Sequence, residues 1–180
     1  MATLGIPSAS LKRFLKNEVG SSKKVLDIGC GDGAMALYLI SALNCNIDGI
    51  DLDKGKVHRA NEKFRTLPTK GLALCRLCDS RKVDKTFQRD TFDTILITHA
   101  IHHLEDLSTV LLKARYVLKR GGRIFVGEYQ RDYGEKIDNC PRFSSNKIKA
   151  MLNTAGFRTI RNHNVHKNFI MITAVKGGIK

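Results

Sequence analysis

The stretch VLDIGCGDG, residues 25–33, places glycines at 29, 31 and 33 behind a short apolar run that carries Asp27 and ends in Ile28. The run is typical of a buried parallel strand, and the glycines let the following turn adopt positive φ angles. In open α/β sheets, ligands bind beyond the carboxyl ends of the strands, where such turns lie. The stretch therefore predicts a cradle for a nucleotide-like ligand, with a tight turn that binds nothing as the alternative.

The glycine spacing separates this cradle from that of dinucleotide-binding enzymes. Those enzymes use GxGxxG, whereas this chain has GxGxG. Asp27 would also repel a pyrophosphate, while it suits a ligand that carries an ammonium or sulfonium group. Both features disfavour an NAD-dependent oxidoreductase.

Two further aspartates end later strands. Asp51, in IDGIDLD, occupies a place where an acid accepts hydrogen bonds from ribose hydroxyls. Asp79, in LCDS, ends the next strand and could receive an adenine amino group, although a cap or turn role explains it equally well. Because the carboxyl ends of parallel strands meet at one edge, three acids around the glycines predict one site.

Hydrophobic patterning predicts an alternation of strands and helices. A helix is expected over about residues 8–19, with Ser8 or Ser10 as its cap. Strands are expected at 23–29, 45–52, 71–78, 92–98 and 122–129, with helices at 34–43, 54–64 and 104–119, the last closed by Gly121–Gly122. A helix over 144–157 and strands at 158–165 and 169–175 complete the chain.

This alternation predicts a parallel sheet with helices on both faces. The last two strands are separated only by residues 166–168, which is too short for a crossover helix. They must therefore form an antiparallel hairpin, so that the sheet ends with one reversed strand. Residues 131–143 form the one long irregular loop, which we interpret as a candidate lid.

Composition sets the broad class. The 180 residues are 42% hydrophobic, which suits one globular domain over residues 1–180. No segment is apolar enough to span a membrane and no signal peptide is recognisable, so the cytoplasm is the expected location. Five cysteines favour free thiols, and the single pair Cys75 and Cys78 is too weak a signal for zinc, so no metal site is predicted.

The net charge is +14, and the stretch from Asn139 to the end has eight Lys or Arg and no Asp or Glu. Such a surface attracts polyanions, which makes nucleic acid a candidate partner. No aromatic-rich RNA-binding motif accompanies the charge.

Together these motifs resemble the class I S-adenosylmethionine-dependent methyltransferases, in particular the compact branch similar to ubiquinone and menaquinone biosynthesis enzymes. The likeness runs over about residues 10–176. It implies a Rossmann-like three-layer α/β sandwich with a seven-stranded, mainly parallel sheet in the order 3-2-1-4-5-7-6 and strand 7 antiparallel. It also implies S-adenosyl-L-methionine as cofactor and S-adenosyl-L-homocysteine as product.

The resemblance implies a role for each matching residue. Gly29 and Gly31 would pass beneath the methionine and ribose, and Asp27 would help to hold the amino group. Asp51 would bind the ribose hydroxyls. The remaining expected contacts, which lie on the adenine and beneath the methionine, come from Leu52, Asp79, Ser80 and Thr98, or from the carbonyl of His99 in place of Thr98.

The catalytic group is harder to predict. A general base is needed only if the acceptor must lose its proton before transfer. His99, His102 and His103 follow the fourth strand, and among them His103 is the preferred catalytic candidate. Packing or capping is the alternative for all three, and Glu128 and Tyr129 are further candidates at the end of the fifth strand.

Departures from related enzymes narrow the reaction. Adenine- and glutamine-amino methyltransferases carry an [N/D]PPY-type motif after strand four, where this chain has Thr98–Ile101. No cysteine stands there, which disfavours pyrimidine C5 chemistry. We expect methyl transfer to an unidentified acceptor, with a small molecule favoured. The alternatives are an RNA or protein methyltransferase, or a non-catalytic cofactor-binding partner subunit.

Overall fold

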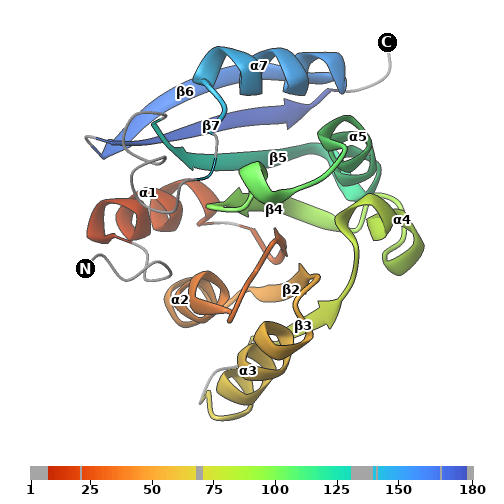
Figure 1. Cartoon of the computed structure of the whole chain (residues 1–180). Helices are drawn as coiled ribbons and strands as arrows, with labels where there is room; N and C mark the ends of the chain where they lie inside the picture. The colour runs from red at the N-terminus through yellow and green to blue at the C-terminus, as the bar shows by residue number, and fades with distance from the viewer. Residues whose placement is uncertain are drawn as a thin grey trace.

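The computed structural model describes residues 8–20, 22–67, 71–130, 140, 142–166 and 168–177. Seven strands form one sheet in the order β3-β2-β1-β4-β5-β7-β6 (Figure 1). The strands are β1 Lys24–Ile28, β2 Asn46–Asp51, β3 Ala73–Leu77, β4 Phe92–Thr98, β5 Leu118–Tyr129, β6 Phe157–His166 and β7 Phe169–Lys176. The helices are α1 Ala9–Val19, α2 Ala34–Leu43, α3 Lys54–Arg65, α4 Val83–Thr86, α5 Leu107–Val117 and α7 Ser145–Thr154, with 3₁₀ turns η1 Ser80–Lys82 and η2 Ile101–His103.

The predicted strand order and the reversed strand are confirmed. The neighbours of β1 and β4 run parallel to them, whereas β7 is antiparallel to both β5 and β6. Tyr129 at the end of β5 therefore lies opposite Phe169 at the start of β7. The short link between β6 and β7 leaves the chain no other way to pair.

Side-chain caps fix where several helices begin. Ser8 accepts a hydrogen bond from Leu11 N at 3.2 Å, which selects it over Ser10 as the cap of α1. Asp53 caps α3 in the same way. The end of α5 differs from the prediction, because Leu118 already pairs with Phe92 and begins β5 before the two glycines.

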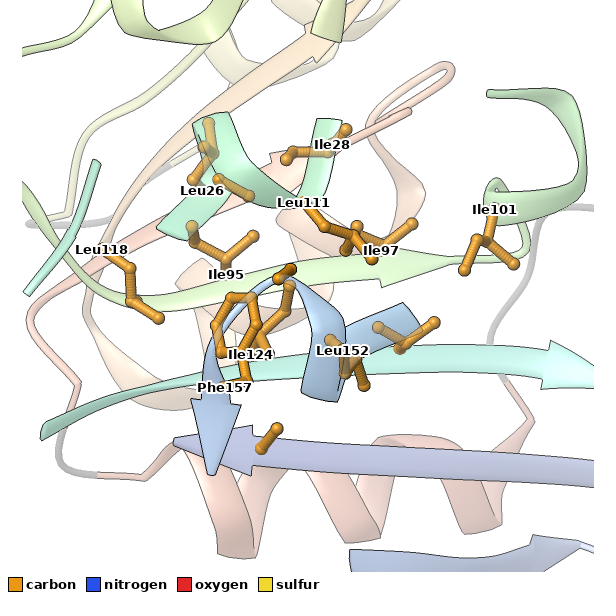
Figure 2. Packing of buried hydrophobic residues seen from close by; sticks show 14 of the residues in the cluster. Leu26, Ile28, Ile95, Ile97, Ile101, Leu111, Leu118, Ile124, Leu152 and Phe157 are labelled. Atoms are coloured by element: carbon orange, nitrogen blue, oxygen red, sulfur yellow. The ribbon is translucent and has the colours of Figure 1, made fainter. Parts of the chain in front are cut away.

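Helices cover both faces of the sheet and create two cores. The first packs sheet residues such as Ile95 and Ile97 against Leu111 of α5 and Leu152 of α7 (Figure 2). The second packs Leu96 and residues of α1, α2 and α3 on the opposite face. Alternate β4 residues thus enter different cores, which explains the continuous apolar run at 92–98. Each fully buried aliphatic side chain contributes roughly 1.5–3 kcal/mol.

The candidate lid lies outside the described residues except for Cys140, Arg142 and Phe143. Among the residues that are described, no helix combines the length and the apolar character needed to cross a membrane.

Gly33, which precedes α2 with φ 79°, provides a test of this packing. A Cβ there would lie 2.7 Å from Phe64 Cζ and 3.0 Å from Ala60 Cβ. We expect Gly33→Ala to lower the free energy of unfolding by roughly 2–4 kcal/mol, through backbone strain and overpacking together. Urea unfolding followed by circular dichroism measures the loss.

Gly121→Ala is the matched control. Gly121 has φ 73°, but a Cβ there would meet no atom within 4 Å. Its loss should stay near about 1 kcal/mol, the cost of strain alone. Equal losses in the two variants would show that contact between α2 and α3 does not require glycine at position 33.

Candidate active site

A cavity of about 620 Å³ opens at the carboxyl ends of β1, β2 and β4. Its volume lies in the range of small-molecule sites. The wall consists of the turn after β1 and residues that follow β2, β3 and β4. Eight of the nine predicted site residues line it, namely Asp27, Gly29, Gly31, Asp51, Leu52, Ser80, Thr98 and His103.

The glycine turn, residues 29–33, supplies a wall of bare backbone. Gly29 and Gly31 have φ angles of 75° and 55°. A Cβ on Gly29 would lie 2.4 Å from the Cβ of Ala100, so no side chain fits there. A Cβ on Gly31 would meet nothing within 4 Å, which leaves the space in front of this residue open. The turn can therefore take a ligand at backbone distance.

Asp51 fixes the shape of this turn. Its Oδ2 accepts a hydrogen bond from Gly31 N at 2.8 Å, and its Oδ1 accepts one from Asp53 N at 2.9 Å. Each carboxylate oxygen can accept a second hydrogen bond, so Asp51 still has acceptor capacity toward the cavity. Leu52 beside it is 66% exposed and offers an apolar surface at the edge of the cavity.

Asp27 is the least satisfied polar group at the site. The residue is 2% exposed, and its Oδ2 has no hydrogen-bond partner among the described residues. Burial, together with the negative charge of Asp51, raises the pKa of Asp27 to about 7. A buried carboxyl oxygen without a partner costs free energy, which a cationic amine in the cavity would recover.

Asp79 is placed differently from the other predicted residues. Both of its carboxylate oxygens face Arg81, with Oδ2 2.7 Å from Nη2 and Oδ1 3.0 Å from Nε. Arg81 holds the pKa of Asp79 below its usual range. The side chain does not line the cavity, whereas Cys78 and Ser80 on either side do. Contact between Asp79 and an adenine stays a prediction.

The end of β4 supplies histidines to the cavity. His99 has φ 55°, and its ring centroid lies 4.8 Å from that of Tyr129 and 4.7 Å from that of Phe169. Burial lowers the pKa of His99 to about 4, so the ring is neutral at neutral pH. His103 is exposed on the cavity wall, with its ring centroid 3.9 Å from that of His102.

A buried ionic network supports these histidines. Glu128 is fully buried at the end of β5 and lies 2.6 Å from His102 Nδ1 through Oε2. Its Oε1 lies 3.1 Å from Arg142 Nε and accepts a hydrogen bond from Tyr129 N at 2.8 Å. Buried charges persist where partners compensate them. The network therefore holds His102 in one orientation behind His103.

Arg142 was not predicted. It lies within the loop predicted over residues 131–143, where no hydrophobic period of the sequence indicates burial, so only the proximity of Glu128 in three dimensions reveals it. The thiols of the CxxC pair also have different neighbours. Cys75 Sγ lies 3.0 Å from Cys30 Sγ, whereas Cys78 Sγ lies 3.2 Å from Thr86 Oγ1.

Comparisons with known proteins agree with this geometry. A family model described as "Methyltransferase domain" matches residues 26–126. O-methyltransferase rstn1 of Aspergillus nomiae is 23% identical over 171 residues, covering 88% of this chain and 75% of its own. The 27-O-demethylrifamycin SV methyltransferase of Amycolatopsis mediterranei is 27% identical over 106 residues, or 59% of this chain, which spans only 38% of that relative's length.

Solved structures share the fold. A SAM-dependent methyltransferase from Aquifex aeolicus aligns with a TM-score of 0.79 at 22% identity, covering 92% of this chain and 89% of its own. Phosphoethanolamine N-methyltransferase 2 of Haemonchus contortus, solved in complex with S-adenosyl-L-methionine, aligns with a TM-score of 0.74 at 18% identity over 94% of this chain and 52% of its own. The family match extends from β1 through most of β5, which is more than half of the chain, so the chain belongs to the methyltransferase domain family.

Proposed function

We propose that the protein transfers the methyl group of S-adenosylmethionine to a small-molecule acceptor. The observation that carries the proposal is Asp27 Oδ2, which has no hydrogen-bond partner within the described parts of the chain and is buried on the wall of the 620 Å³ cavity beside bare glycine backbone. Two relatives, an O-methyltransferase and a methyltransferase of 27-O-demethylrifamycin SV, support a small organic acceptor.

The residues present fit the cofactor. Asp27 and Asp51 bring two carboxyl groups to the glycine turn, which suits a ligand that carries an amino group and a sulfonium, although Lys56 and Arg59 also line the cavity. In this proposal Asp27 holds the amino group, and Asp51 accepts hydrogen bonds from the ribose hydroxyls. Leu52 and Ser80 lie on the wall where the adenine would pack.

When bound, S-adenosylmethionine supplies an activated methyl group and leaves as S-adenosylhomocysteine. The protein then has to hold the acceptor atom in line, and such positioning can supply about 7–11 kcal/mol. His103 lies on the cavity wall, and in this proposal it takes a proton from the acceptor. His99 remains neutral because of its low pKa, and Glu128 orients His102 against the ring of His103.

Transfer of a labelled methyl group into fractionated cell extract tests the proposal directly. We expect the label in the small-molecule fraction. His103→Gln should reduce the rate by about 100-fold or more, the usual contribution of a general base, with cofactor affinity unchanged. The control is His58→Gln on α3, whose side chain is 70% exposed. Label in RNA or protein would overturn the small-molecule assignment.

Asp51→Asn tests the cofactor site by itself. The amide loses the negative charge and places an N–H₂ group against one of the two backbone donors that Asp51 accepts from. We expect calorimetry to show roughly 100-fold weaker binding of S-adenosylmethionine, about 2.7 kcal/mol. Asp53→Asn keeps a cap for α3 and should bind normally. Equal affinities in both variants would count against the role of Asp51.

The pKa of Asp27 predicts two pH dependences. The pKa of Asp27 is about 7 in the folded protein and 3.8 ordinarily, so between these pH values the folded state binds a proton that the unfolded state has lost. The free energy of unfolding therefore decreases as the pH rises from about 4 to about 7. Without cofactor, Asp27→Asn should be more stable than the natural protein by roughly 2–4 kcal/mol at pH 8 and by less than about 1 kcal/mol at pH 4.

Cofactor affinity should change in the opposite sense. In the natural protein it should rise as pH increases through about 7, since the ionised carboxylate binds the amine. Asp27→Asn should bind weakly with no such rise. Urea unfolding and calorimetry across this pH range measure both effects, and parallel pH profiles for the two proteins would refute the assignment.

A further inference from the structure

A second concave site lies at the opposite end of the sheet from the cavity. This basic depression, about 220 Å³ in volume, lies between the segment before β4, the helix α5, the start of β5 and the end of β7. Its lining residues are Arg89, Leu112, Arg115, Tyr116, Arg120, Lys176 and Gly177. Because β4 and β5 begin here, a ligand in the depression is remote from the carboxyl ends that form the cavity (Figure 1).

Positive charge in the depression exceeds the charge that balances it. The depression has four cationic side chains, and within the described residues Asp90 is the one carboxylate that forms an ion pair with any of them. Lys176 Nζ lies 2.6 Å from Asp90 Oδ1, and Arg89 Nε lies 3.4 Å from Oδ2, so two cations share that carboxylate. Like charges gathered in a concave surface raise the local concentration of anions.

The other two guanidinium groups retain donors for a ligand. Arg115 gives its Nε–H to the carbonyl of Gly156 at 3.2 Å. Arg120 is exposed and forms no ion pair within the described parts of the chain, although its charge adds to those of Lys176 and Arg89 in lowering the pKa of Asp90. A guanidinium presents a planar set of N–H donors that matches the oxygens of a phosphoryl group.

An aromatic and an apolar surface lie directly beside these cations. Leu112 and Tyr116 are four residues apart on α5, and they are 54% and 44% exposed. The guanidinium carbon of Arg89 lies 6.0 Å from the ring centroid of Tyr116. A ligand that joins a phosphoryl group to a flat ring, directly or through a sugar, could contact both the arginines and the surface formed by Leu112 and Tyr116.

We propose that the basic depression binds a nucleotide, with its phosphoryl group on the arginines and its base stacked on Tyr116. The volume of about 220 Å³ is below the usual range for sites that enclose a whole small molecule, so we expect the depression to enclose only part of one nucleotide unit, either free or within a strand. This inference goes beyond the proposed methyl transfer and does not depend on it.

Two probes distinguish the sources. AMP represents the free nucleotide and is measured by calorimetry. A fluorescein-labelled ten-nucleotide single-stranded RNA is measured by anisotropy at about 50 and 200 mM KCl. The variant is Arg89→Ala combined with Arg120→Ala. We expect it to weaken binding of the accepted probe at least tenfold, and Tyr116→Ala to weaken it at least about fivefold, as loss of stacking requires.

The matched control is Arg13→Ala combined with Lys16→Ala on α1. Both residues are exposed, and the pair removes the same charge at another surface. The affinity of this control variant for the accepted probe should differ less than twofold from that of the natural protein. Cofactor affinity at the cavity should stay unchanged in all variants, which separates this test from that of the methyltransferase site.

Binding of AMP assigns the depression to a free nucleotide, whereas binding of the RNA alone, falling steeply with salt, assigns it to a strand. Equal losses in the variant and the control would show that only the overall charge attracts the probe, and would overturn the proposal. Absence of binding for both probes at about 1 mM would overturn it as well.

Discussion

The hydrogen bond from Gly31 N–H to the Asp51 carboxylate joins the ends of two neighbouring strands, and the shape of the cavity depends on it. Parallel pairing of β1 with β2 brings the two residues to the same edge. The positive φ of Gly31 then turns its N–H toward the carboxylate, a geometry that L side chains rarely tolerate. This hydrogen bond thus fixes the conformation of the glycine turn and the position of the Asp51 carboxylate, and the space in front of the turn stays open for a ligand.

The buried carboxyl groups on the two sides of the cavity differ in how well their neighbours compensate them. Glu128, on the side of β5, is compensated by His102, Arg142 and a backbone N–H, so it has little to gain from a ligand. Asp27 has an unsatisfied oxygen and a raised pKa, which makes binding of a cation favourable. The compensated group is suited to positioning side chains, whereas the uncompensated one is suited to recognition.

How far the sequence predicts the structure depends on the range of each interaction. Strand periods, caps and the short link at 166–168 are local, so the alternation of strands and helices, the closing hairpin and the glycine turn beside Asp27 and Asp51 follow from them. The strand order is expected from the family resemblance instead, because no local pattern determines which strands become neighbours. The early end of α5 arises from pairing of Leu118 with Phe92, which is not visible in a helix pattern. The burial of Arg142 depends on a partner 14 positions away, and the ion pair between Asp79 and Arg81 depends on how η1 turns.

The total charge of +14 hides an uneven distribution over the sheet. At the carboxyl ends of the strands, Asp27 and Asp51 place two carboxyl groups beside the glycine turn, although the protein as a whole is strongly basic. At the amino ends, one carboxylate is shared among the cations of the basic depression. Fields inside concave, partly buried sites are set by the nearest groups, because solvent and salt screen the distant ones. A cationic cofactor and an anionic ligand can therefore bind the same basic protein, each at the end of the sheet whose nearest charges are opposite to its own.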